Sequence, residues 1–147
     1  MSKRLLICGD RDWSDFDVIR KTIEHQPPDT VIIQGEGRGA DALAKRAALE
    51  AGLQVESYAA DWRQYGVKAG PLRNRRMLAE GKPDVVVGFH SDIGGKSKGT
   101  RDMLRIALQA GVPTFLFGSD RRFQKLSPET LEALCHHTTS QSLEPAL

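Results

Sequence analysis

The sequence is poor in several features that would assign a protein to a class at once. Its two cysteines, Cys8 and Cys135, do not make a disulfide framework, so we expect a reduced, cytosolic protein. The 21 lysine and arginine residues are nearly balanced by 19 acidic residues, and a net charge of +2 does not by itself imply nucleic-acid binding. The first apolar run ends at Cys8, which is too short for a signal peptide or a membrane span. What is left is a globular protein of ordinary composition, with 39% hydrophobic and 27% charged residues.

Short apolar runs alternate with helix-like segments along the chain. The apolar runs are rich in β-branched residues and show little strict alternation, as strands of a parallel sheet covered on both faces do. They span residues 5–8, 31–33, 55–58, 85–87 and 114–117. The helix-like segments span residues 15–25, 40–51, 71–80 and 100–110, and a last helix is expected from Ser127. This order predicts an α/β/α fold in three layers, with a mostly parallel sheet of about five strands.

The helix-to-strand junctions and the ends of the chain indicate the domain organisation. Gly52 and Gly111 each follow an alanine-rich helix end and precede a strand, where glycine suits the left-handed position that ends a helix. The sequence contains no linker that would divide it, so we expect a single domain over residues 1–137. The polar residues 138–147 are expected to form a flexible tail.

The most informative motif is the run Gly-Gly-Lys-Ser-Lys-Gly-Thr at residues 94–100. It lies between a predicted strand and a predicted helix, so backbone N–H groups, the helix dipole and two lysines converge on one point. Such an arrangement favours anions, above all phosphate. The spacing differs from that of the P-loop, which has four residues between its first glycine and Gly-Lys-Ser/Thr. The run therefore predicts a phosphate site without identifying the ligand.

Further polar and glycine residues follow the other predicted strands, at the edge where open α/β sheets bind ligands. These residues are Gly9, Asp10, Arg11, Gly35, Gly37, Arg38, Asp61, Trp62 and His90. Asp41 is expected to complement a helix dipole, because a carboxylate there would repel a phosphate. Simpler roles stay open for several others: a solvated surface position for Arg38, a core or lid position for Trp13 and Trp62, and a structural role at a strand end for His90.

The segment at residues 69–77 places an arginine and an asparagine at the start of a helix. Pro71 suits the first helical turn, so Arg73 and Asn74 would lie where fixed donors meet an anion and where Asn74 can read a polar edge. Residues 75–76, both arginine, are expected on a solvated face.

In their order along the chain, these motifs resemble the YspA, cpYpsA-related branch of the SLOG superfamily, long catalogued as a domain of unknown function. The resemblance spans residues 4–117 and rests on the runs at residues 9–13, 34–41, 60–62, 65–66, 69–77 and 99–100. It implies a Rossmann-like sheet and a site for a nucleotide or a nucleotide-derived ligand, such as a nucleoside phosphate or an ADP-ribose-like molecule. It implies no established reaction.

Better understood relatives are the LOG phosphoribohydrolases, which cut the N-glycosidic bond of a nucleoside monophosphate and carry the pattern Pro-Gly-Gly-X-Gly-Thr-X-X-Glu. Residues 94–95 and 99–100 resemble its glycines and threonine, and Arg73 resembles the arginine of the preceding helix. Met103 stands where the glutamate would be and cannot act as a carboxylate, while Asp102 points about 100° away around the helix. The remaining candidate catalytic residues are Arg73, Asp10 and Asp61.

Three functions stay open at this point. The first is binding, and possible hydrolysis, of a nucleotide-derived small molecule; the second is N-glycosidic hydrolysis with a substituted acid. The third is single-stranded nucleic-acid binding, because DNA-processing A proteins also carry a SLOG-related domain. The resemblance to LOG enzymes implies a homodimer or larger homo-oligomer.

We expect no cofactor and no membrane partner. We also expect no metal, because the adjacent residues Cys135, His136 and His137 point in different directions on a helix. The residues expected to bind the ligand are Gly9, Asp10, Arg11, Gly35, Gly37, Arg38, Trp62, Arg73, Asn74, His90, Gly94, Gly95, Lys98, Gly99 and Thr100.

Overall fold

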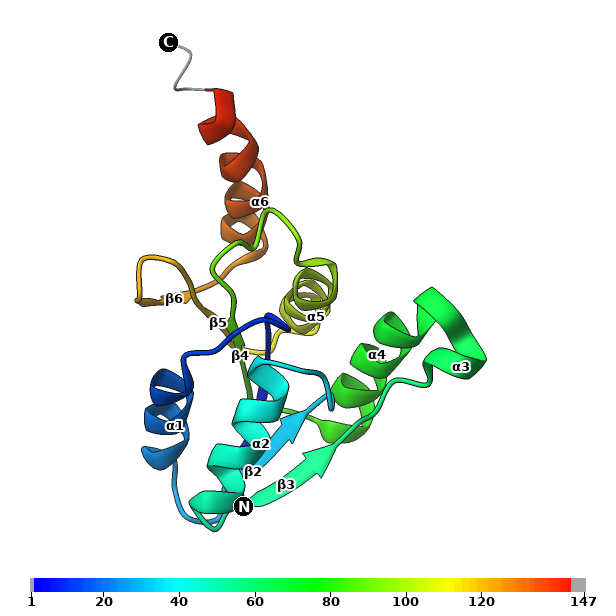
Figure 1. Ribbon diagram of the computed structural model, residues 1–147, viewed down its shortest axis with the longest axis vertical. Coiled ribbons are helices and arrows are strands. Elements are labelled where there is room, and N and C mark those ends of the chain that lie inside the picture. The colour runs from blue at the N-terminus through cyan, green and yellow to red at the C-terminus, as the bar shows by residue number, and fades with distance from the viewer. Residues whose placement is uncertain (1, 144–147) are drawn as a thin grey trace.

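The computed structural model describes the backbone of residues 2–143 and the side chains of residues 2–136 (Figure 1). The strands are β1 (Arg4–Gly9), β2 (Val31–Gln34), β3 (Gln54–Ser57), β4 (Val85–Phe89), β5 (Thr114–Phe117) and β6 (Phe123–Lys125). The helices are α1 (Phe16–Glu24), α2 (Ala40–Glu50), α3 (Trp62–Tyr65), α4 (Ala69–Gly81), α5 (Lys98–Gln109) and α6 (Pro128–Leu143), with a 3-10 turn η1 (Gly66–Lys68) between α3 and α4. Among these described elements, no helix is both long and apolar enough to cross a bilayer.

The strands form one sheet in the order β3-β2-β1-β4-β5-β6. The pairs from β3 to β5 are parallel and β6 runs antiparallel to β5, so the predicted Rossmann-like fold with a mostly parallel sheet is confirmed. The short edge strand β6 is additional to the five predicted strands. Its three residues are all exposed, and therefore the apolar signal that marks the other strands is missing there.

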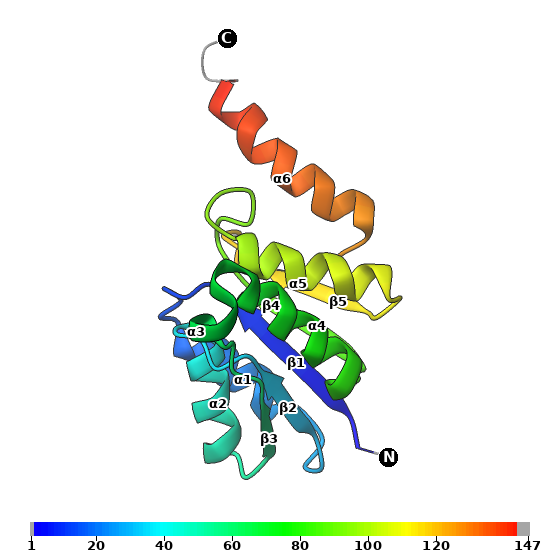
Figure 2. The same ribbon diagram turned by 90° about the vertical axis from the view of Figure 1, so that its right-hand side faces the viewer.

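Two apolar cores cover the two faces of the sheet. On β1, Leu5 and Ile7 face a core shared with α1 and α2, whereas Leu6 and Cys8 face a core shared with α4 and α5. Figure 2 shows α4 and α5 lying beside each other on one side of the strands, with α1 and α2 on the other. Side chains that alternate between two buried faces explain why β1 reads as a continuous apolar run.

The element boundaries agree with the predicted ones within a few residues, apart from two segments. Gly52 and Gly111 have φ values of +74° and +77°, which confirms the left-handed positions predicted after α2 and α5. The chain between β3 and α4 contains α3 and η1, which were not predicted. In the predicted tail, residues 138–143 continue α6, and residues 144–147 lie outside the described residues.

Candidate functional site

A cleft of about 1010 Å³ opens at the carboxyl edge of the sheet. It is bounded by the segments that follow β1, β2, β3 and β4 and by the first turns of α4 and α5. The strand order turns back between β1 and β4, which is the place where open α/β sheets bind ligands. Its volume is at the upper end of the range of about 300–1,000 Å³ typical of small-molecule sites.

One wall of the cleft is the first turn of α5. The first intrahelical hydrogen bond runs from the Arg101 N–H to the Ser97 carbonyl at 2.8 Å, so the N–H groups of Lys98, Gly99 and Thr100 precede it. The Ser97 hydroxyl donates to the Ile93 carbonyl instead of accepting from the helix. The end of α5 that carries the positive partial charge is thus open toward the cleft.

The glycine-rich run before α5 offers a ligand fewer backbone N–H donors than its composition indicates. The Gly95 N–H already donates to the Asp92 carbonyl at 3.0 Å, and the Ser97 N–H donates to the Gly95 carbonyl at 3.0 Å. A Cβ atom on Gly95 would lie 2.1 Å from an Asp92 carboxylate oxygen, so this glycine allows a tight turn. The N–H groups of Gly95 and Ser97 are therefore used within the turn, whereas those of the first turn of α5 are open to an anion.

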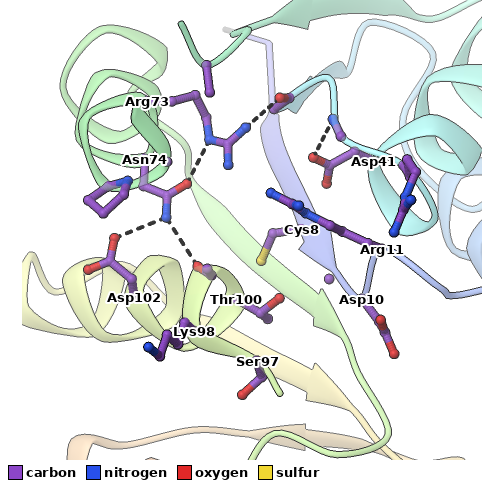
Figure 3. A pocket seen from close by; sticks show the side chains of 18 of the residues that line it. Cys8, Asp10, Arg11, Asp41, Arg73, Asn74, Ser97, Lys98, Thr100 and Asp102 are labelled. Atoms are coloured by element: carbon purple, nitrogen blue, oxygen red, sulfur yellow. Dashed lines mark hydrogen bonds between the residues drawn. The ribbon is translucent and has the colours of Figure 1, made fainter. Parts of the chain in front are cut away.

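Arg73 of α4 faces the cleft with a fixed guanidinium (Figure 3). Its Nη1 donates to the Gly35 carbonyl at 2.5 Å and its Nε donates to Asn74 Oδ1 at 2.9 Å. A Cβ atom on Gly35 would lie 2.6 Å from Arg73 Nη1, so the glycine makes room for the arginine. Burial lowers the pKa of Arg73, and the nearby Asp41 carboxylate opposes this shift. The Arg73 guanidinium is therefore a positive charge in a fixed position, and it has further N–H donors for a ligand.

Asn74 joins the first turns of α4 and α5. It is 2% exposed, and its Nδ2 donates both to the Gly99 carbonyl at 3.1 Å and to Asp102 Oδ2 at 3.0 Å. Arg75, predicted on a solvated face, is exposed and also contacts Asp102 at 3.1 Å. The Asn74 amide lines the cleft, but both of its donor hydrogens bind protein oxygens, which holds the open end of α5 against Arg73.

The opposite wall is the turn between β2 and α2. Gly39 has a φ of +63°, and a Cβ atom there would lie 2.2 Å from the Asp10 carbonyl oxygen. The Ala40 N–H donates to that same carbonyl at 3.0 Å, so the turn is bonded to the loop after β1. Asp41 Oδ2 accepts the Gly37 N–H at 3.0 Å. Burial raises the pKa of Asp41, while the Gly37 N–H and Arg73 act in the opposite direction.

The two tryptophans have different positions. Trp13 packs on Phe89 and Phe117, with ring centroids 5.8 and 6.0 Å apart, in the core. Trp62 lines the cleft, is 48% exposed and lies under the Arg11 guanidinium, 5.4 Å from the ring centroid. An exposed aromatic face with a cation above it is thus part of the rim of the cleft.

Most predicted site residues line the cleft, but two of the described ones do not. Asp61 is outside it, since its carboxylate accepts the Gln64 N–H at 3.1 Å and caps α3; Gly94 is also outside. His90 lines it, is buried, and accepts the Asp92 N–H on Nδ1 at 3.0 Å. The predicted residues that line the cleft are Gly9, Asp10, Arg11, Gly35, Gly37, Arg38, Trp62, Arg73, Asn74, His90, Gly95, Lys98, Gly99 and Thr100.

Asp102 lines the cleft, although the sequence pattern did not place it among the candidate site residues. Met103 is 1% exposed and packs in the core beneath α5, whereas Asp102 lines the cleft. The apolar stripe of α5, with Leu104 and Ala107, was a signal that position 103 points inward. Cys8 also lines the cleft, and burial raises the pKa of its thiol.

Among the described side chains, no group of three or more His, Cys, Asp or Glu residues is arranged to hold a metal ion.

Sequence comparison finds a family model and a relative that match this chain. The model of the YspA, cpYpsA-related SLOG family matches residues 3–65, which hold the segments after β1 and β2. Gene 61 protein of Mycobacterium phage D29 is 38% identical over 125 residues, which cover 79% of this chain and 97% of that protein.

A solved structure supports the fold alone. DNA processing protein A (DprA) from Streptococcus pneumoniae matches 95% of this chain with a TM-score of 0.66 and 18% sequence identity. The chain spans 56% of the length of that protein. The family model matches residues 3–65, and the phage relative matches most of the length of the chain; this chain belongs to the YspA, cpYpsA-related SLOG family.

Proposed function

We propose that the cleft binds a nucleotide or nucleotide-derived molecule, with a phosphate group at the first turn of α5. The observation that carries this proposal is the convergence of two kinds of donor from two helices. The N–H groups of Lys98, Gly99 and Thr100 open α5, and the held guanidinium of Arg73 extends from α4 into the same cleft. A helix N-terminus and an arginine with spare donors are the two groups that proteins most often use for phosphate.

The rim of the cleft suits the remainder of a nucleotide. Trp62 offers an exposed aromatic face, and Arg11 above it is a planar cation on which a base can also stack. Asp10, on the loop after β1, adds a hydrogen-bond acceptor on the lining. Membership of the SLOG family supports a nucleotide-derived ligand in general terms.

Isothermal titration calorimetry against AMP, GMP, CMP, UMP, NAD and ADP-ribose tests the proposal. We expect at least one of them to bind, and we expect Arg73→Ala to weaken that ligand about 10- to 100-fold, since a charged hydrogen bond contributes about 1.5–3 kcal/mol. Arg76→Ala is the matched control, because Arg76 lies on the same helix and pairs with Glu80 on the surface. Absence of binding at millimolar ligand would refute the proposal. If a single-stranded oligonucleotide binds instead, with steep salt dependence, the cleft serves nucleic acid.

A second candidate function, N-glycosidic hydrolysis, is favoured by the position of Asp102. Its carboxylate lines the cleft beside the proposed phosphate position and is oriented by Asn74 and Arg75. In such a reaction water adds to the sugar C1′ and the base departs with a proton, and a carboxylate stabilises the oxocarbenium-like transition state. Chromatography of a nucleoside monophosphate incubated with the protein should show free base, lost in Asp102→Asn and in Arg73→Ala. Intact monophosphate after hours excludes this candidate.

The homo-oligomer implied by the resemblance to LOG enzymes is a prediction that light scattering after size exclusion can test directly.

A further inference from the structure

We infer that Asp41 determines ligand specificity in this cleft by accepting a sugar hydroxyl and rejecting a second phosphate. The inference rests on the proposed function, because it concerns the far end of a ligand whose phosphate lies at α5. It defines the ligand class as a nucleoside 5′-monophosphate, or an ester of one, with a free hydroxyl on its ribose.

The helices α2 and α5 both begin at the cleft, and they offer opposite charges to a ligand. In α5 the Ser97 hydroxyl is turned away to Ile93, which leaves the N–H groups of the first turn open. In α2 the Asp41 carboxylate folds back over the helix start and accepts the Gly37 N–H at 3.0 Å. The N-terminus of α2 is therefore neutralised by its own side chain, and a phosphate that approached it would meet a carboxylate.

The sequence around Asp41 is adapted to this position. A Cβ atom on Gly37 would lie 2.9 Å from Asp41 Oδ2, so a side chain at residue 37 would push the carboxylate out of its place. An ionised carboxylate has about four acceptor positions; the Gly37 N–H uses one of them, and the Gly35 N–H also acts on the carboxylate. Acceptor capacity is thus left on the side of Asp41 that lines the cleft.

The location of Asp41 separates it from the phosphate site. α2 packs on one face of the sheet and α5 on the other, and Figure 3 shows Asp41 across the cleft from Lys98 and Asp102. The positive charges near Asp41 are those of Arg73 and Arg11. Arg73 is held by Gly35 and Asn74, and its charge acts on Asp41 as well as on Asp102 beside α5. A ligand held by Arg73 would therefore also meet the Asp41 carboxylate on this wall of the cleft.

The test compares ligands that differ only on the ribose. The probes are the monophosphate that binds best in the panel above, its 2′-deoxy and 3′-deoxy forms, and its 2′,5′- and 3′,5′-bisphosphates. For the wild-type protein we expect at least one deoxy form to bind about 3- to 10-fold more weakly, from the loss of one hydrogen bond, and the matching bisphosphate to bind at least about 10-fold more weakly.

The variant Asp41→Asn removes the charge and keeps an oxygen for the Gly37 N–H. It should recover at least about tenfold of the affinity lost by the bisphosphate and change the monophosphate less. Glu50→Gln is the matched control, since Glu50 ends the same helix and pairs with Arg46 on the surface. A structural role for Asp41 would instead weaken all probes equally, and that result overturns the inference.

The binding results distinguish failure of this inference from failure of the proposed function. If no nucleotide binds the wild-type protein, the proposed function fails and the inference with it. If the monophosphate binds and its bisphosphates and deoxy forms bind equally well, the inference alone is overturned. Because this second readout uses the wild-type protein, it holds whether or not Asp41→Asn folds.

Discussion

The turn between β2 and α2 and the turn between β4 and α5 look alike in the sequence and differ in their charge. Both are rich in glycine, both follow a buried parallel strand, and both lead into a helix that begins at the cleft. Counted from the helix start, Gly39 corresponds to Ser97 and Asp41 corresponds to Gly99. The first helix begins with a carboxylate that accepts an N–H group of the preceding turn, and the second begins with open N–H groups.

The comparison shows that glycine content does not by itself define an anion site. Gly39 is needed because its φ is +63° and the Asp10 carbonyl lies against it, and Gly95 leaves room for the Asp92 carboxylate beside it. In both turns the glycines serve the path of the backbone. The charge that a ligand meets depends on the residue at the second helical position, which is aspartate in one turn and glycine in the other.

The largest expected effect is on the stability of the turn between β2 and α2, which we call the closed turn because the Asp41 carboxylate lies at its helix start. Gly39→Ala should lower the free energy of unfolding by at least about 3 kcal/mol, because the new Cβ atom would lie 2.2 Å from a backbone oxygen and the left-handed φ is also unfavourable. Gly52→Ala is the control: its φ is +74°, and a Cβ atom there meets open space among the described residues. It should cost about 1 kcal/mol, and urea denaturation measures both. Equal costs would show that the contact between Gly39 and the loop after β1 is not tight.

The next substitution gives the turn between β4 and α5, which we call the open turn, the same charge as the closed turn. Gly99→Asp places a carboxylate at the position that corresponds to Asp41, in a space where a Cβ atom meets no described neighbour. The fold should be retained, since aspartate suits the first turn of a helix, but nucleotide affinity should fall about 10- to 100-fold through like-charge repulsion. Gly99→Asn is the matched uncharged control in calorimetry. A similar loss in both variants would indicate a steric effect, and no loss in either would place the phosphate elsewhere.

The smallest effect concerns the acid stability of the closed turn. Hydrogen bonds from Gln34 and from Lys45 lower the pKa of Glu36 from its ordinary 4.5 to about 2. A depressed pKa means that the ionised form stabilises the fold fully above pH 4.5, and that this contribution is lost as the pH falls toward 2. Because Glu36 is 32% exposed, the contribution is on the order of 1 kcal/mol.

Glu36→Gln should therefore be less stable than the wild-type protein at neutral pH and nearly equal to it near pH 2, with Glu50→Gln as control. Urea denaturation at several pH values measures the difference. A difference that does not change with pH would mean that the charge of Glu36 contributes nothing to the turn.

Much of the fold and of the location of the site could be predicted from the sequence. The parallel strands were marked by continuous apolar runs, and the left-handed glycines after α2 and α5 by their place between a helix end and a strand. The short strand β6 gave no such signal, because an exposed edge strand of three residues buries no side chain. The residues that line the cleft were found because the ends of parallel strands meet at one edge of the sheet.

What the sequence by itself determined is which segments form the parallel strands and which residues follow their carboxyl ends, since both depend on local periodicity and chain direction. Only the tertiary structure decided what those residues do to one another. It tied Asn74 to Gly99 and Asp102, and it put Asp41 on the wall opposite α5. The physical reason is that side-chain hydrogen bonds depend on the distance between elements far apart in the chain, and no local pattern records that distance.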